Sequence, residues 1–259
     1  MMRALLIAAI AILPPAHVRA QGALLETLED LRQVKEPPQF RAGTSTSPAP
    51  ARAEVANVPL PREQLATSTC VSWSATYAAA SQAARRYGLG ATVTLSPAFT
   101  YNQVSGDRTC HATTAISKTL DLLREVGALP IEEFVFDPGW CGRLPTEAER
   151  KRAARYRIKG WSKLDATDIE AIKVLLARGV PVIFSMRVGT KVRGQRGDGV
   201  IDSDEGDIGG HAMIAVGYDN ARQAFRIQNS WGRNWGDGGY AWFSYEFWKR
   251  SARVAYVID

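Results

Sequence analysis

The chain has 259 residues, 46% of them hydrophobic, which suffices for one large domain or two closely packed lobes. No internal repeat is visible, which argues against solenoid and propeller architectures. The formal net charge of +6 is a mild basic excess, too small to indicate a nucleic-acid-binding surface.

The first twenty residues predict an export signal. Arg3 supplies a positive n-region, residues 5–13 form a short apolar h-region, and residues 18–20 (VRA) fit a cleavage site. The apolar run is too short to cross ~30 Å of hydrocarbon. We therefore expect a signal peptide over residues 1–20 and a secreted or periplasmic protein with no stable membrane span. Without Arg3 and Arg19, 30 basic residues stand against 26 acidic ones, a net charge of +4.

Residues 21–57 read as an N-terminal extension and linker. Leu24, Leu28 and Leu31 share one face of an expected short helix over residues 23–35. Residues 42–61 are rich in Ala, Pro, Ser and Thr, a composition that cannot pack a core. We expect the globular domain over residues 58–259.

Helices are predicted first along this domain, and strands later. The expected helices cover residues 70–88, a stretch that starts at Ser96 and Pro97, residues 114–125 and residues 168–178. The expected strands cover residues 180–188, 211–218, 224–228 and 240–245. This order predicts an α+β fold, with a helical lobe over about residues 62–157 and a β-rich lobe over about residues 158–259.

Three cysteines remain after removal of the signal: Cys70, Cys110 and Cys141. In an oxidising compartment two of them can pair, and the third is either an intermolecular link or a reactive thiol. A nucleophilic thiol needs a lowered pKa, a base within reach and donors for an oxyanion. Cys70 opens an expected helix, whose free N–H groups favour a thiolate, although a lone cysteine also fits a small buried position.

The candidates for a base are His111 and His211. His111 follows Cys110 directly and is expected at the surface or in a structural role. His211 opens a predicted strand, so its ring projects from a rigid element. Asn229 ends the strand over residues 224–228, and a fixed amide oxygen can hold a histidine in one tautomer. An isolated asparagine there could equally be a turn residue.

Together these segments resemble the papain-like cysteine peptidase family. Residues 64–70 (QLATSTC) resemble its nucleophile segment, residues 209–218 (GGHAMIAVGY) its histidine segment, and residues 228–240 (QNSWGRNWGDGGY) its asparagine segment. Residues 95–101 (LSPAFTY) resemble a helix start of the family. His211 and Asn229 follow Cys70 by 141 and 159 residues, near the spacing of about 130–150 residues in papain-like enzymes.

The resemblance implies a papain-like two-lobe fold with the active site in the cleft between a helical lobe and a β-barrel-like lobe. It implies Cys70 as nucleophile, His211 as acid and base, Asn229 as the residue that orients His211, and Gln64 in the oxyanion hole. Trp231 would cover the Asn–His pair. We also expect a disulfide between Cys110 and Cys141, and no metal or organic cofactor, since the acidic stretch over residues 202–207 lacks the EF-hand order.

The sequence departs from the family at two places. The nucleophile motif C-G-[SA]-C-[WY] reads Thr67-Ser68-Thr69-Cys70-Val71, without the first cysteine and the aromatic residue. A long propeptide is absent, so residues 21 to about 57 would have to stand in for it. They could lie in or beside the cleft, pack on a distal surface, or stay disordered.

The implied function is an exported, monomeric peptidase that hydrolyses peptide or protein substrates and has no nucleic-acid partner. One alternative is an acyltransferase that uses the same acyl-enzyme with an amine in place of water. The other is a non-catalytic peptide-binding module, which would typically have lost Cys70, His211 or Gln64.

Overall fold

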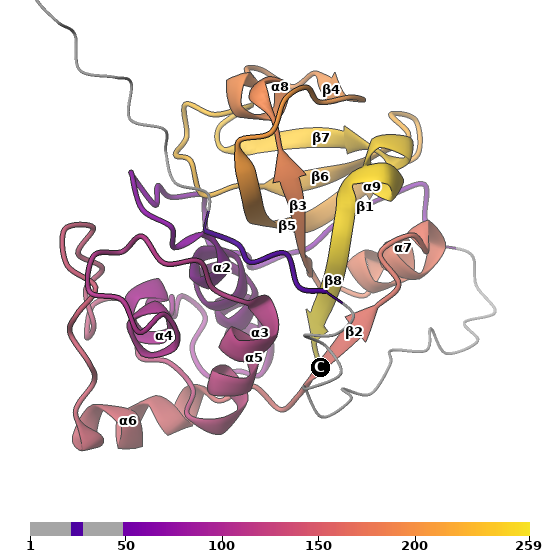
Figure 1. The fold of residues 1–259 in the computed structure, drawn as a ribbon. Helices are drawn as coiled ribbons and strands as arrows, with labels where there is room; N and C mark the ends of the chain where they lie inside the picture. The colour runs from indigo at the N-terminus through magenta and orange to yellow at the C-terminus, as the bar shows by residue number, and fades with distance from the viewer. Residues whose placement is uncertain (1–21, 28–48) are drawn as a thin grey trace, which may run out of the picture.

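A computed structural model describes residues 22–27 and 49–259 (Figure 1). The predicted signal peptide over residues 1–20, and the part of the extension over residues 28–48, lie outside the described residues.

The first half of the domain is built around one long buried helix. This helix runs without interruption through α2 (Cys70–Ser72), the π-helical η1 (Trp73–Ala80) and α3 (Ser81–Arg86), as the sequence predicts. Every residue of η1 is buried, and its four alanines let neighbouring elements approach closely, while Trp73 and Tyr77 pack as large side chains. The surrounding elements are α4 (Pro97–Val104), α5 (Ile116–Glu125), α6 (Glu147–Ala153) and the 3-10 turn η2 (Ala154–Tyr156).

The starts of these helices follow local sequence signals. The Ser96 hydroxyl accepts the backbone N–H of Phe99 at the start of α4, where Pro97 takes the first helical position. Thr146 and Glu149 form a capping box at the start of α6. By contrast α5 begins after Ala115, which offers no side-chain cap.

The second half of the domain forms an open eight-stranded sheet, with strand order β2-β8-β3-β5-β6-β7-β4 and β1 on β5. All pairs are antiparallel except β4 with β7. The strands are β1 (Arg52–Glu54), β2 (Trp161–Leu164), β3 (Val182–Val188), β4 (Val200–Ile201), β5 (Gly209–Asp219), β6 (Ala224–Gln228), β7 (Tyr240–Ser244) and β8 (Ala252–Ile258). The helices of this half are α7 (Ile169–Ala177), α8 (Thr190–Gly194) and α9 (Tyr245–Ser251). The α+β class is confirmed, although the lobe expected to resemble a barrel is an open sheet.

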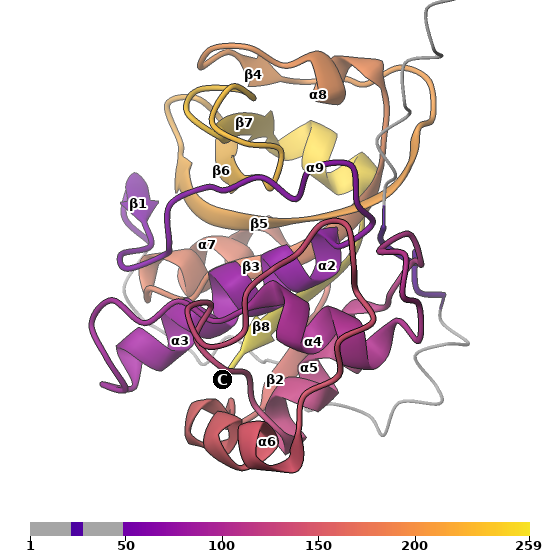
Figure 2. The same cartoon turned by 90° about the vertical axis from the view of Figure 1, so that its left-hand side faces the viewer.

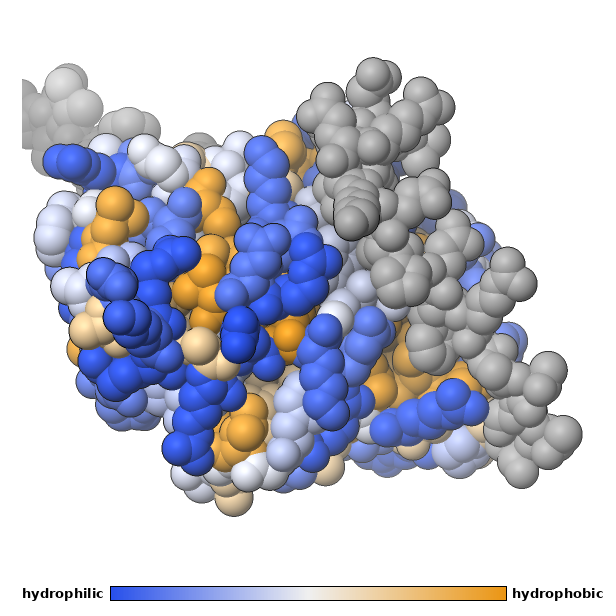
Figure 3. All heavy atoms as spheres, turned by 90° about the horizontal axis from the view of Figure 1, so that it is seen from below, coloured by the Kyte–Doolittle hydropathy of each residue, from blue (hydrophilic) through white to orange (hydrophobic). Residues whose placement is uncertain are grey.

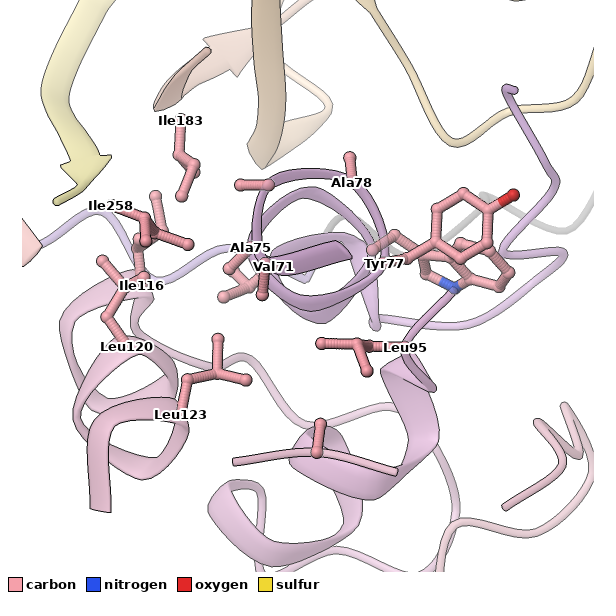
Figure 4. Packing of buried hydrophobic residues seen from close by; sticks show 14 of the residues in the cluster. Val71, Ala75, Tyr77, Ala78, Leu95, Ile116, Leu120, Leu123, Ile183 and Ile258 are labelled. Carbon is pink, nitrogen blue, oxygen red and sulfur yellow. The ribbon is translucent and has the colours of Figure 1, made fainter. Parts of the chain in front are cut away.

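The sheet separates two buried apolar clusters, because alternate residues of a strand point to opposite faces. On β3, Ile183 packs against the helical lobe, whereas Val182 and Phe184 pack on the far side with residues of α7 and α9. Figure 4 shows the long helix end-on, with Ile183 of the sheet and Leu120 and Leu123 of α5 beside it. In Figure 2, β5 curves across this same helix, so the start of the helix and the start of β5 meet at the junction of the lobes.

Two expectations about the N-terminal region need correction. Residues 23–27, expected in a helix, are not helical. Ala23 forms an isolated bridge with Thr114, because backbone groups of residues 22–24 bond to Gly210 and Thr114 of the domain and not to each other. The ordered domain also begins before residue 58, since Arg52–Glu54 pair with β5 and Val55 is buried. The composition of residues 49–57 gave no sign of this pairing, which depends on an edge supplied by β5.

Among the described residues, no helix is long and apolar enough to cross a membrane. Figure 3 shows one face of the molecule, where hydrophobic side chains form small separate areas between hydrophilic ones. The part of this face that the described residues form therefore shows no large continuous apolar surface.

Candidate active site

Cys70 is the first residue of the long helix and is fully buried at the junction between the lobes. It is the free cysteine among those described, since Cys110 and Cys141 form the expected disulfide, with their Cα atoms 5.1 Å apart. The backbone N–H of Ala212, the residue after His211, points at the thiol. The fold thus brings the thiol beside the start of β5, from a position 141 residues earlier in the chain.

His211 is hydrogen-bonded to Asn229. Its Nε2 lies 2.7 Å from Oδ1 of Asn229, and its ring stacks on Trp231 with centroids 4.4 Å apart. Because an amide oxygen only accepts, Nε2 carries the proton in the neutral ring and Nδ1 is left with a free lone pair. Nδ1 is buried and has no hydrogen-bond partner among the described atoms. This is the arrangement of a base that is ready to accept a proton.

Trp231 shields this pair from water. It is 6% exposed and makes an edge contact with Trp235, whose ring N–H donates to the carbonyl oxygen of Val192. The two tryptophans fix the loop that follows β6, so the Asn229 amide keeps its place against His211. The Oδ1 of Asn229 also accepts the backbone N–H of Ser230, which sets the direction of the amide.

Gln64 lies on the other side of the junction and is bound to both lobes. Its Oε1 accepts the hydroxyl of Ser230 at 2.7 Å, and its Nε2 donates to the carbonyl oxygen of Thr67 at 2.6 Å. Its backbone N–H donates to the carbonyl oxygen of Ser230. One N–H of the amide therefore remains for another acceptor.

Residues 22–27 run across the junction of the lobes, near the start of α2 (Figure 1). They help to bury the Cys70 thiol, which is fully buried. The backbone N–H of Gly22 points at the Cys70 thiol, and the N–H of Ala23 donates to the carbonyl oxygen of Gly210, next to His211. Leu24 and Gly22 pair with the backbone of Thr114 through bonds of 2.9 Å. The sequence left open whether this segment lies in the cleft, because its contacts beside the thiol are made by backbone groups.

Burial keeps both reactive groups uncharged in this closed arrangement. It raises the pKa of the Cys70 thiol to about 11, despite the backbone N–H groups of Ala212 and Gly22, which lower it. It lowers the pKa of His211 to about 4, against the opposing effect of the bond to Asn229. The low thiol pKa expected from the helix N-terminus is therefore not a property of the covered site, since desolvation outweighs the helix dipole here.

Two other groups singled out by the sequence lie outside the site. His111 is exposed, and its backbone N–H donates to the carboxylate of Asp107. In the acidic stretch over residues 202–207, the Asp204 carboxylate accepts backbone N–H groups of Lys191 and Val192. Within residues 22–27 and 49–259, no group of three or more His, Cys, Asp or Glu side chains could hold a metal ion.

An open hollow of about 490 Å³ continues from the site past Trp231. Its walls include Arg193, Arg196, Arg233 and Glu63. Cys70 and His211 do not line it, because both are fully buried. A chain lying there would be close to Trp231 but would reach the thiol only if residues 22–27 moved away.

The chain is similar to known proteins along most of its length. It matches the papain family cysteine proteases over residues 49–251. It is 30% identical over 138 residues to the uncharacterized peptidase C1-like protein L477 of Acanthamoeba polyphaga mimivirus, a match that covers 48% of this chain and 44% of that protein. It is 25% identical over 123 residues to cysteine proteinase RD21A of Arabidopsis thaliana, a match that covers 47% of this chain and 25% of that protein. The matches thus cover less than half the length of these curated relatives.

Solved structures share the fold. Xylellain, a cysteine protease from Xylella fastidiosa, superimposes with a TM-score of 0.80 at 23% identity, covering 96% of this chain and 99% of xylellain. Procathepsin B S9 from Trypanosoma congolense gives a TM-score of 0.74 at 18% identity, and the match covers 93% of this chain and 86% of that one. Because the family match spans most of the sequence and the fold is shared along nearly all of it, the chain belongs to the papain family of cysteine proteases.

Proposed function

We propose that this chain is an exported cysteine peptidase that cleaves peptide bonds through an acyl-enzyme on Cys70. The observation that carries the proposal is the His211–Asn229 pair. The bond to Asn229 leaves Nδ1 of His211 buried and without a partner among the described atoms. The next residue, Ala212, points its backbone N–H at the Cys70 thiol. Export agrees with the disulfide between Cys110 and Cys141, which is typical of oxidising compartments.

The reaction uses these groups in order. His211 Nδ1 takes the proton of Cys70, and the thiolate attacks the substrate carbonyl. The Cys70 N–H and the remaining N–H of the Gln64 amide stabilise the oxyanion. His211 then gives its proton to the leaving amine. A water molecule, deprotonated by His211, hydrolyses the thioester and frees Cys70.

Residues 22–27 hold the enzyme in a latent form in this proposal. They cover the thiol, bond to both sides of the junction and keep Cys70 and His211 uncharged. A substituted Gly22 cannot take this position, because a Cβ there would lie 1.7 Å from the carbonyl oxygen of Ser68. The full-length Gly22→Val protein is therefore the matched, uncovered form of the enzyme.

The test compares full-length wild type, Gly22→Val and the double variant Gly22→Val with Cys70→Ala on a diverse peptide mixture, with products read by mass spectrometry. We expect Gly22→Val to cleave faster than wild type and the double variant to be inactive while still folded. Equal cleavage by the double variant would refute the role of Cys70. Transfer of the acyl group to an added amine in preference to water would identify an acyltransferase, and binding without cleavage would identify a peptide-binding module.

A further inference from the structure

Glu26 places a carboxyl group in a small buried pocket at the junction of the lobes. Glu26 is only 7% exposed. The hydroxyl of Tyr256 on β8 lies 3.3 Å from Oε2. The first N–H groups of α5, at Ile116 and Ser117, and the hydroxyl of Ser117 face the carboxyl and favour its charged form, which lowers its pKa against the effect of burial. Glu26 thus lies at the start of α5, where Ala115 offers no side-chain cap.

The walls of this pocket belong to the domain, whereas the carboxyl comes from the covering segment. Ser117 is 2% exposed and Tyr256 is fully buried, so neither hydroxyl has access to bulk water. Ser185 faces the same side of the sheet, diagonally across from Tyr256, and its buried hydroxyl has no partner among the described atoms. When residues 22–27 leave, the hydroxyls of Ser117 and Tyr256 lose the carboxyl that faces them, which is costly in a buried place.

The pocket borders the path that a substrate must take. A peptide can present its carbonyl to Cys70 only where residues 22–24 now lie, between Gly210 and Thr114. Thr114 is two residues before Ile116, whose N–H forms part of the pocket. A substrate chain that replaces the covering segment therefore passes the mouth of the pocket with its own side chains.

We infer that this pocket is a specificity pocket that selects a glutamate side chain of the substrate, with glutamine as its uncharged equivalent, in the position that Glu26 now fills. The inference rests on the proposed peptidase function. An acceptor of this length restores the bonds to Ser117, Tyr256 and the start of α5. A leucine of similar size leaves the donors unpaired, and a lysine adds donors to a site that already has too many.

The selection of glutamate depends on pH, whereas that of glutamine does not. Burial raises the pKa of Glu26 above its ordinary value, although the bonds from Ser117 and Tyr256 oppose this effect. Among the described groups that contact the carboxyl, Tyr256 on β8 is the titratable one, while α5 contributes only a hydroxyl and backbone N–H groups. A substrate glutamate therefore enters most easily with its proton, so its advantage falls as pH rises through the raised pKa.

The experiment uses the full-length Gly22→Val protein and peptides that carry Glu, Gln, Leu or Lys at each position on the N-terminal side of the cleaved bond. We expect one position at which Gln exceeds Leu and Lys in kcat/KM by about tenfold or more at every pH tested. At that position Glu should match Gln at low pH and fall behind it as pH rises. Tyr256→Phe, made in the same background, should reduce the ratio of Gln to Leu. Tyr245→Phe, which removes a tyrosine hydroxyl bonded to Asn220 in the sheet lobe, should leave the ratio unchanged.

The outcomes separate the two proposals. Two results would overturn the pocket assignment while the peptidase function stands. One is that peptides with Leu are cleaved as well as or better than peptides with Gln at every position. The other is a preference for Gln that Tyr256→Phe does not change. A complete lack of cleavage by the Gly22→Val protein would overturn both.

Discussion

At His211, one hydrogen bond decides which ring nitrogen can react. The Oδ1 of Asn229 can only accept, so it holds the proton on Nε2 and leaves Nδ1 as the base. Trp231 stacks on the ring and excludes water that could compete for either nitrogen. The proposed reaction therefore depends on Asn229, a residue that does not touch the substrate in this proposal.

We expect Asn229→Ala to lower kcat by about ten- to a hundredfold, because His211 can then rotate and exchange its proton between the two nitrogens. KM should change much less, since the orientation of His211 matters most in the transition state. Steady-state kinetics in the Gly22→Val background measure both. Asn102→Ala is the matched control: this buried asparagine bonds to the carbonyl oxygen of Arg143, away from the site, and its loss should reduce stability without lowering kcat.

Gln64 has two roles that single substitutions can separate. Gln64→Ala removes an oxyanion donor and should lower kcat by about 10²–10³. Ser230→Ala removes only the hydroxyl that holds Oε1 of Gln64, while the bond from Nε2 to Thr67 remains, so its effect should be smaller. A rise in KM with kcat unchanged for Gln64→Ala would show that Gln64 binds substrate and does not act on the oxyanion.

At the scale of elements, residues 22–27 act as a short strap across the junction of the lobes. Backbone hydrogen bonds to Gly210 and Thr114 hold the strap in place, and Glu26 anchors its end at the start of α5. The Glu26 carboxyl, buried against Tyr256, makes the position of the strap sensitive to pH.

The activity of the strapped enzyme should rise with pH relative to the uncovered one. The pKa of Glu26 is raised when the strap is bound, so binding is strongest below the pKa of a free glutamate, about 4.3, and weakens as pH rises through the raised value. We expect the ratio of wild-type to Gly22→Val activity to increase between pH ~4 and ~8. Glu26→Gln should flatten this ratio. A ratio that stays constant or falls in the wild type would contradict the assignment of Glu26.

At the scale of the whole molecule, the disulfide stabilises loops that the helical core does not hold. Cys110 and Cys141 are 31 residues apart in the sequence and form a small buried cluster with Tyr101, separate from the two main cores. Closing a loop of this size lowers the entropy of the unfolded chain.

We expect the double variant Cys110→Ser with Cys141→Ser to lose roughly 3–4 kcal/mol of unfolding free energy on the loop-entropy model. Denaturant unfolding measures this loss. Cys70→Ala, which leaves the disulfide intact, is the control and should change stability much less. A double variant as stable as the wild type would show that the loops are held by other contacts.

The sequence by itself determined the elements with strong local signals. The start of α4 at Ser96 and Pro97 follows from a capping residue, and the strand over residues 224–228 from hydrophobic periodicity; both signals act over a few neighbours. The helix from Cys70 was also predicted, although Thr69 makes no side-chain cap bond at its start. The segments around Cys70, His211 and Asn229 were recognisable because a catalytic group requires a fixed local chain. The fold class followed from the order of helices and strands.

Only the tertiary structure decided the features that depend on distant partners. β1 and the bridge at Ala23 exist because β5 and Thr114 offer free backbone groups, which no local pattern encodes. The burial that keeps Cys70 and His211 uncharged arises where two lobes and a strap meet, so the helix N-terminus alone gave the wrong direction for the thiol pKa. Glu26 reads as an ordinary surface glutamate in the sequence, and only its place between α5 and Tyr256 makes it an anchor, because desolvation is a property of packing.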